Sequence, residues 1–134
     1  MAVDLRNSAG ANIRISSGHW AVYLTLAEAF GWKPAGTKAP STFPVAKRWS
    51  GRYDSSDGQT VIEADAKLLA QVLHAAAVSP KISIALPDVI RHIERQVEAA
   101  GTRIPDQMRM KLEDFSKEFS PVLEFLYQGE FEVH

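Results

Sequence analysis

Proline and glycine residues divide this chain into short segments, and the apolar residues inside those segments follow two different periods. In most of the chain, apolar residues recur every three or four positions, which predicts amphipathic helices that bury one face. At both ends, apolar and polar residues alternate, which predicts strands with one buried face. Helices and strands do not follow each other in a βαβ order. We therefore predict an α+β fold with an antiparallel sheet and about five helices packed on one side.

The N-terminal part predicts a β-hairpin followed by a helix. Two alternating runs flank the turn-rich segment 7–12, and their apolar members are Val3, Leu5, Ile13 and Ile15. Ser16 or Ser17 is suited to cap a helix that is expected to end near Phe30. Gly31 then follows at the position where glycine commonly stops a helix.

The rest of the chain predicts short strands between helices. Strands are expected over 52–54, 59–61, 82–84 and 131–133. Helices are expected to start near Glu63, Pro87, Pro105 and Pro121. Three of these starts are prolines, because a missing backbone N–H costs nothing at the first position of a helix.

The length and composition predict a single globular domain over residues 1–134. The apolar content of 46% supports a hydrophobic core, and the absence of cysteine excludes disulfides and thiolate chemistry. The N-terminus lacks the features of a signal peptide. No apolar run approaches the roughly 18 residues that a membrane span needs. These observations predict a cytoplasmic protein without a membrane partner.

The charges are distributed unevenly, although the net charge is only −1. Every charged residue between Phe30 and Tyr53 is basic, namely Lys33, Lys38, Lys47, Arg48 and Arg52. The chain from Glu113 onward is mostly acidic. These regions are either solvated surfaces or two faces that attract different partners, or one partner of mixed charge. Binding of all five cations to duplex phosphates would give a log–log salt slope of about −4.5. The chain has no helix–turn–helix signature, so we do not expect a nucleic-acid partner.

The segment from Trp32 to Arg48 is predicted to be a long loop, because it contains three prolines and no apolar period. Loops of this length in compact domains are usually functional or mobile. Aromatic, charged and amide side chains gather around a turn directly after it. The candidate binding residues are Lys47, Arg48, Trp49, Arg52, Tyr53, Asp54, Asp57 and Gln59.

The two central aromatics leave two arrangements open. On an extended segment, Trp49 and Tyr53 point to the same face, which is either a core face or an aromatic platform beside the basic loop. Arg52 then faces solvent or Asp54.

The turn that follows also leaves alternatives open. Asp57 precedes a glycine, so its side chain is expected to bond nearby backbone amides. The amide of Gln59 either holds this turn or contacts a ligand.

No catalytic constellation is present. The chain lacks a nucleophile-elbow pattern, a P-loop and a dinucleotide-binding glycine pattern. If Gly58 took the sixth position of a calcium loop, Ala64 would take the last position, where a glutamate is needed. No two histidines lie three or four positions apart. We therefore expect no metal, no cofactor and no catalytic residue.

Four segments carry a resemblance to a family. They read Gly-Trp-x-Pro-x-Gly-Thr (31–37), Trp-x-Gly-x-Tyr (49–53), Asp-Gly-Gln-x-Val (57–61) and Asp-Ala-x-x-Leu-Ala (65–70). In these segments and in the tail 125–133, the chain resembles a group of small uncharacterised bacterial proteins. Ser56 and Ile62 depart from the pattern of that group, and residues 80–119 have no counterpart in it. The resemblance implies an accessory or immunity-type protein that acts by binding.

Taken together, these features predict a non-enzymatic cytoplasmic protein that binds another protein, of an immunity or effector-neutralising kind. The alternative is a small enzyme or ligand-binding domain with a site around Tyr53, Asp54, Asp57 and Gln59. A deep pocket lined by those four side chains would favour the alternative.

Overall fold

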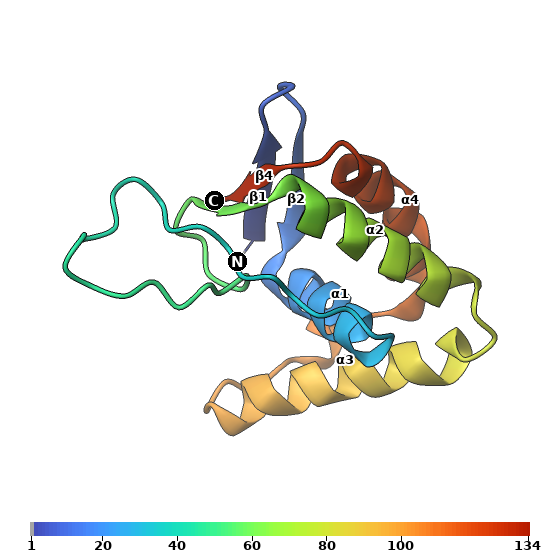
Figure 1. Cartoon of the computed structure of the whole chain (residues 1–134). Coiled ribbons are helices and arrows are strands. Elements are labelled where there is room, and N and C mark those ends of the chain that lie inside the picture. The colour runs from blue at the N-terminus through green and yellow to red at the C-terminus, as the bar shows by residue number, and fades with distance from the viewer. Residues whose placement is uncertain (1) are drawn as a thin grey trace.

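The computed structural model describes residues 2–134, which contain four strands and four α-helices (Figure 1). The strands are β1 (Ala2–Asn7), β2 (Asn12–Ser16), β3 (Gln59–Val61) and β4 (Phe131–Val133). The helices are α1 (Ser17–Ala29), α2 (Glu63–Val78), α3 (Ile82–Ala99) and α4 (Leu112–Tyr127). A single 3₁₀ turn, η1 (Asp106–Met108), lies between α3 and α4. The predicted α+β class and antiparallel sheet are confirmed.

The sheet has the order β2-β1-β4-β3, and every neighbouring pair is antiparallel. Leu5 in β1 lies opposite Ile13 on one side and Val133 on the other. In the second half of the sheet, Val61 lies opposite Phe131. Buried residues alternate with more exposed ones along the strands, so the sheet buries one face against the helices. Segments from the two ends of the chain thus form the middle of the sheet.

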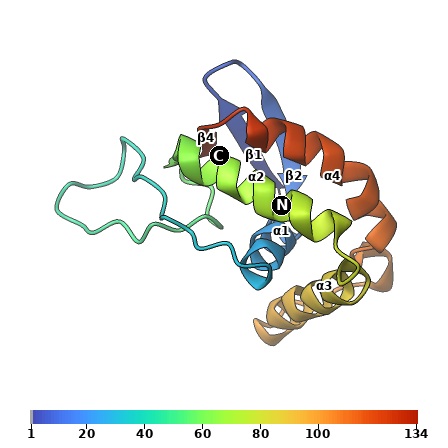
Figure 2. The ribbon, with the colours of Figure 1, turned by 45° about the vertical axis from the view of Figure 1, so that its right-hand side comes forward.

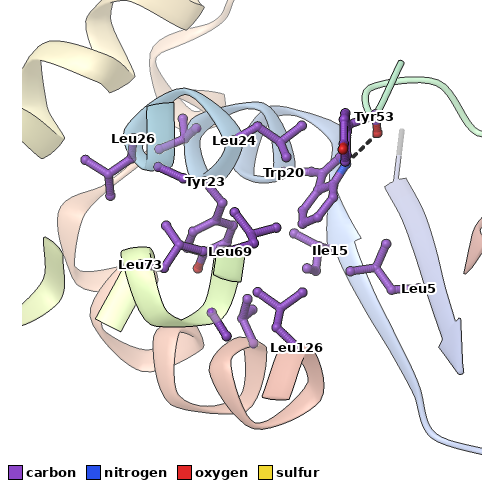
Figure 3. Close-up of a cluster of buried hydrophobic side chains, with 14 of the residues drawn as sticks. Leu5, Ile15, Trp20, Tyr23, Leu24, Leu26, Tyr53, Leu69, Leu73 and Leu126 are labelled. Atoms are coloured by element: carbon purple, nitrogen blue, oxygen red, sulfur yellow. Dashed lines mark hydrogen bonds between the residues drawn. The ribbon is translucent and has the colours of Figure 1, made fainter. Parts of the chain in front are cut away.

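Helix α1 lies at the centre of the fold, and it is buried on several sides. The side chain of Ser16 caps it by accepting a hydrogen bond from the His19 backbone N–H at 3.1 Å. Gly31 follows the helix with a φ of 101°, a left-handed conformation that suits glycine. Trp20 and Tyr23 are among its fully buried residues, and they pack with leucines from α2 and α4 (Figure 3). A helix that is apolar around most of its circumference is expected in such a central position.

The other helices surround α1. Helices α2 and α4 pack against each other, and α3 packs mainly against α1 (Figure 2). One hydrophobic cluster connects all four helices with the sheet. Within residues 2–134, no single helix is long and apolar enough to cross a membrane, and α2 and α3 meet that criterion only as a pair bent by 118°.

The prediction of a strand at 82–84 and a helix start at Pro87 is wrong, because α3 begins at Ile82 and continues through Pro87. Ile82 and Leu86 belong to the same helical stripe. Pro87 removes the hydrogen bond that the carbonyl of Ser83 would accept. Ser83 is exposed, so water can satisfy that carbonyl and the helix survives.

The prediction of about five helices is also wrong. The helix expected at Pro105 is only the 3₁₀ turn η1, and the two segments on either side of Pro121 form one helix, α4. Pro121 and Lys117, whose carbonyl loses a hydrogen bond, are both exposed. The buried stripe from Phe115 to Phe125 therefore continues past the proline. The strand expected at 52–54 does not form, since that segment is irregular.

Candidate functional site

The chain between α1 and β3 forms a long loop over residues 32–58 that projects from the body (Figures 1 and 2). Its regular pairing is limited to an isolated bridge between Lys38 and Thr60 beside β3. Residues 44–48, which we call the loop tip, are all exposed, and Val45 is fully accessible to solvent. The predicted long loop is thus present, and it extends ten residues beyond Arg48.

The base of the loop is fixed by the carboxylate of Asp65 in the first turn of α2. The Tyr53 hydroxyl donates a hydrogen bond to this carboxylate and accepts one from the Gly36 N–H at 2.9 Å. The indole N–H of Trp32 donates to the other oxygen of Asp65 at 3.1 Å. The rings of Trp32 and Tyr53 also pack edge to face, with centroids 5.1 Å apart. Both ends of the loop are therefore tied to α2.

Tyr53 is a structural donor in this arrangement, because its side chain has no free hydrogen-bonding group. The residue is 8% exposed, and its backbone carbonyl accepts a hydrogen bond from the indole of Trp20 at 2.9 Å. Burial is the main cause that raises the pKa of Tyr53 well above its ordinary value, and the hydrogen bond to Asp65 raises it further. The hydroxyl therefore stays protonated and remains a donor to the carboxylate.

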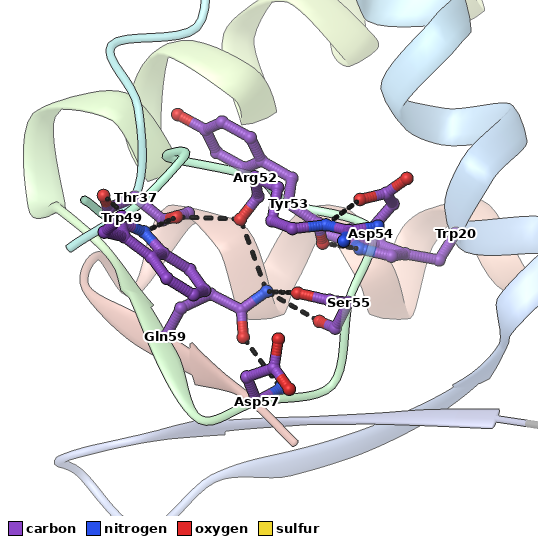
Figure 4. Close-up of polar contacts among 9 residues, drawn as sticks. All are labelled: Trp20, Thr37, Trp49, Arg52, Tyr53, Asp54, Ser55, Asp57 and Gln59. Carbon is purple, nitrogen blue, oxygen red and sulfur yellow. Dashed lines mark hydrogen bonds and ion pairs between the residues drawn. The ribbon is translucent and has the colours of Figure 1, made fainter. Parts of the chain in front are cut away.

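Gln59, which is completely buried, holds the turn that precedes β3 (Figure 4). Its Nε2 donates to the Ser55 carbonyl at 2.6 Å and to the Arg52 carbonyl at 3.3 Å. Its Oε1 accepts from the backbone N–H of Asp57 at 3.0 Å. Of the two roles considered for Gln59, the structure shows the one in which it holds the turn. The backbone of Asp57 takes part in this turn, rather than its side chain.

Trp49 is half-buried and connects the two sides of the loop. Its indole N–H donates to the carbonyl and to the hydroxyl of Thr37, at 3.1 and 3.0 Å. Phe43 packs edge to face on the Trp49 ring, with centroids 5.0 Å apart. Trp49 and Tyr53 therefore lie in different environments and do not form one shared aromatic platform.

The remaining candidate residues are exposed. Arg52 and Asp54 form an ion pair at 3.0 Å on the surface. This is one of the two arrangements that were expected for Arg52. The side chains of Lys47 and Arg48, at the loop tip, form no ion pair with any residue of 2–134. Asp57 is exposed as well.

The four residues of the ligand-binding alternative do not line one cavity. Tyr53 and Asp54 border a cavity of about 280 Å³ between the loop, α1 and α3. Asp57 borders a different cavity of about 400 Å³ near the end of β4. Gln59 lines neither of them, because its amide is used inside the turn.

A half-buried carboxylate, that of Glu118, lies outside the predicted site, where α1 meets α4. Glu118 Oε1 accepts hydrogen bonds from the Tyr23 hydroxyl at 2.7 Å and from His19 Nδ1 at 3.0 Å. The imidazole stacks on the Phe115 ring at 4.2 Å. His19 and Tyr23 share a helix face at a spacing of four, but Glu118 is 99 residues from His19. Sequence spacing therefore gave no signal for the carboxylate.

The charge states of this cluster follow from its contacts. Burial acts to raise the pKa of Glu118, but the hydrogen bonds from His19 and Tyr23 outweigh it, and the pKa lies below its ordinary value. Burial and the contact with Glu118 raise the pKa of Tyr23 far above the ordinary tyrosine value. Glu118 is therefore an ionised acceptor, and Tyr23 is a neutral donor.

Within residues 2–134, no group of three or more histidine, aspartate or glutamate side chains is arranged to hold a metal ion. Comparison with protein-family models, with curated proteins and with solved structures found no match for this chain. The resemblance to the group of small bacterial proteins therefore stays a prediction.

Proposed function

We propose that this chain is a non-enzymatic cytoplasmic protein that binds another protein through the 32–58 loop, and that it neutralises a bacterial toxin or effector. The observation that carries the proposal is the contrast within the loop. Its base is fixed by buried hydrogen bonds to Asp65 and Gln59, while all residues of the tip are exposed. A projecting segment of this kind is suited to contact a partner. The implied immunity-type role comes from the resemblance.

The charge of the loop indicates an acidic partner surface. Lys47 and Arg48 lie side by side at the tip, and no acidic residue occurs between Phe30 and Tyr53. A cluster of one sign attracts a surface of the opposite sign and speeds its association. Val45, which is fully exposed beside these cations, offers apolar area for the same contact.

The fixed base favours binding for a second reason. Ordering a flexible segment on association costs conformational entropy, and a loop that is already held at both ends loses less of it. Trp49 contributes to this order by bonding to Thr37 across the loop. A partner therefore meets a tip whose position relative to the body is largely set.

The test is a pull-down from the source cells with three tagged proteins. These are the unchanged chain, the variant Lys47→Glu/Arg48→Glu, and the variant Arg95→Glu/Arg103→Glu. The last changes the charge equally at exposed sites away from the loop. We expect a stoichiometric protein partner with the first and third proteins, and its loss with the second. Recovery of no stoichiometric partner, or equal recovery by all three proteins, would contradict the proposal.

A further inference from the structure

A cavity of about 430 Å³ lies between the start of α1, the second half of α3 and the segment that joins α3 to α4. Its apolar walls come from Ile93, Val97 and Ile104, and the thioethers of Met108 and Met110 border it. None of the candidate binding residues of the loop lines it. Its volume lies within the range of about 300–1,000 Å³ that is typical of small-molecule sites.

The imidazole of His19 also lines this cavity, in an orientation fixed by other residues. Glu118 is an ionised acceptor that already receives the Tyr23 hydroxyl hydrogen, so His19 Nδ1 must carry the hydrogen that it shares with the same oxygen. The stacked ring of Phe115 limits rotation of the imidazole. In neutral His19 the remaining nitrogen, Nε2, is consequently a hydrogen-bond acceptor.

The hydrogen bond from Nδ1 to Glu118 is the one that the His19 ring makes with residues 2–134, so Nε2 has no partner among them. The side chain as a whole is 15% exposed, so most of the imidazole is covered while Nε2 keeps access to solvent. The cavity therefore combines an oriented imidazole acceptor with apolar residues, and the charged residues Glu94, Arg109, Lys111 and Asp114 also line it.

We propose that this cavity binds a small aromatic molecule whose ring hydroxyl donates a hydrogen bond to His19 Nε2, that is, a ligand of the phenol class. A phenolic O–H is a good donor to a neutral imidazole. The aliphatic walls and the two methionines suit the aromatic ring, because thioether sulfur makes favourable contacts with aromatic rings.

The wall formed by the α3–α4 segment is held in place before any ligand arrives. The backbone N–H of Met110 donates to the buried carboxylate of Glu94 at 3.1 Å. Arg109 contacts both Glu94 and Glu98, at 3.8 and 3.3 Å. A preformed wall reduces the ordering cost of binding.

The probe is p-cresol, titrated into the unchanged protein to the solubility limit of the probe. The matched compound is 4-methylanisole, which keeps the ring and the methyl group but lacks the donor. Nitrogen-15 spectra of the histidine rings and methyl spectra of the methionines report the result. We expect p-cresol to produce a saturable shift at His19 Nε2 and at the methyl groups of Met108 and Met110. The loss of one hydrogen bond should make 4-methylanisole bind about tenfold more weakly.

Two variants complete the test. His19→Asn removes the acceptor and should reduce the affinity for p-cresol to that of 4-methylanisole. His92→Asn makes the same change at an exposed histidine on α3 and should leave the affinity unchanged. The comparison of the two compounds on the unchanged protein needs no variant, so it decides the matter even if His19→Asn does not fold. Absence of a saturable shift at His19, or equal affinity for both compounds, would overturn the proposal.

Discussion

The buried carboxylate of Asp65 and the half-buried carboxylate of Glu118 each accept hydrogen bonds from a tyrosine and from an aromatic ring nitrogen, yet the two clusters differ in the hydrogen-bonding groups that remain free. Asp65 receives a tyrosine hydroxyl and an indole N–H, from Tyr53 and Trp32. Glu118 receives a tyrosine hydroxyl and an imidazole nitrogen. An indole has a single nitrogen, so the first cluster is closed. An imidazole has two, so the second cluster presents a free acceptor to a cavity. The comparison shows how the choice of one ring separates a cluster with no free ring nitrogen from a cluster that keeps one.

The clusters also differ in burial. Asp65 is 3% exposed, whereas the side chain of Glu118 is 25% exposed. Removing an acceptor costs most where water cannot replace it. We therefore expect the Asp65 cluster to contribute more to stability.

The largest effect is expected from Asp65→Ala, which leaves the Tyr53 hydroxyl and the Trp32 indole without their acceptor. We expect the free energy of unfolding to fall by about 3 kcal/mol in urea denaturation. Hydrogen exchange should become faster at the loop base. Asp54→Ala, at an exposed carboxylate, is the control and should change stability by less than about 0.5 kcal/mol. Equal effects of the two substitutions would show that Asp65 does not hold the loop.

The next effect concerns Glu118→Ala, which should lower the free energy of unfolding by about 1–2 kcal/mol, because water can reach part of this site. Glu124→Ala, on the exposed face of the same helix, serves as the control. A double-mutant cycle with Tyr23→Phe should give a coupling of at least about 0.5 kcal/mol. Additive effects would argue that the Tyr23–Glu118 hydrogen bond contributes nothing.

Acid should weaken the second cluster in a predictable direction. The pKa of Glu118 is lower in the folded protein than in the unfolded chain. Ionised Glu118 therefore contributes fully to the free energy of unfolding above the ordinary glutamate pKa of about 4.3. This contribution is lost as the pH falls through the pKa of Glu118 in the folded protein. Between pH 5 and pH 3, roughly one unit on each side of the ordinary glutamate pKa, the unchanged protein should lose more stability than Glu118→Gln. Parallel curves in urea titrations at these pH values would contradict this.

The smallest effect is expected at the loop tip. Lys47→Glu/Arg48→Glu should alter the free energy of unfolding by no more than about 0.5 kcal/mol, because neither side chain forms an ion pair within residues 2–134. A clear loss of stability in urea denaturation would mean that the tip contacts the body. It would then remove the contrast between base and tip on which the proposed function rests.

Local signals explain which parts of the fold the sequence could predict. The hairpin, α1, α2 and β4 were predicted because period, cap and turn residues lie close together along the chain. The prolines at 87 and 121 misled the prediction, because their cost depends on whether the freed carbonyl meets water. That is a property of tertiary exposure, and sequence period does not reveal it.

The candidate site likewise has contacts that the sequence could predict and contacts that it could not. The surface pair Arg52–Asp54 and the role of Gln59 in the turn follow from short spacing, and both were among the arrangements considered. The burial of Tyr53 depends on Asp65, twelve residues away on another element. The cluster around Glu118 depends on packing between α1 and α4, and no local pattern marks it.

The clamp at the loop base also bears on how this protein tolerates change. Since both ends of the loop are held by Asp65 and by the turn at Gln59, the exposed residues 44–48 at its tip can be exchanged or extended with little effect on the core. Closing a loop of twice the length costs only about 0.6 kcal/mol more. Residues 44–48 are therefore a natural position for grafted peptides, and the same scaffold can carry different sequences there while keeping its interior unchanged.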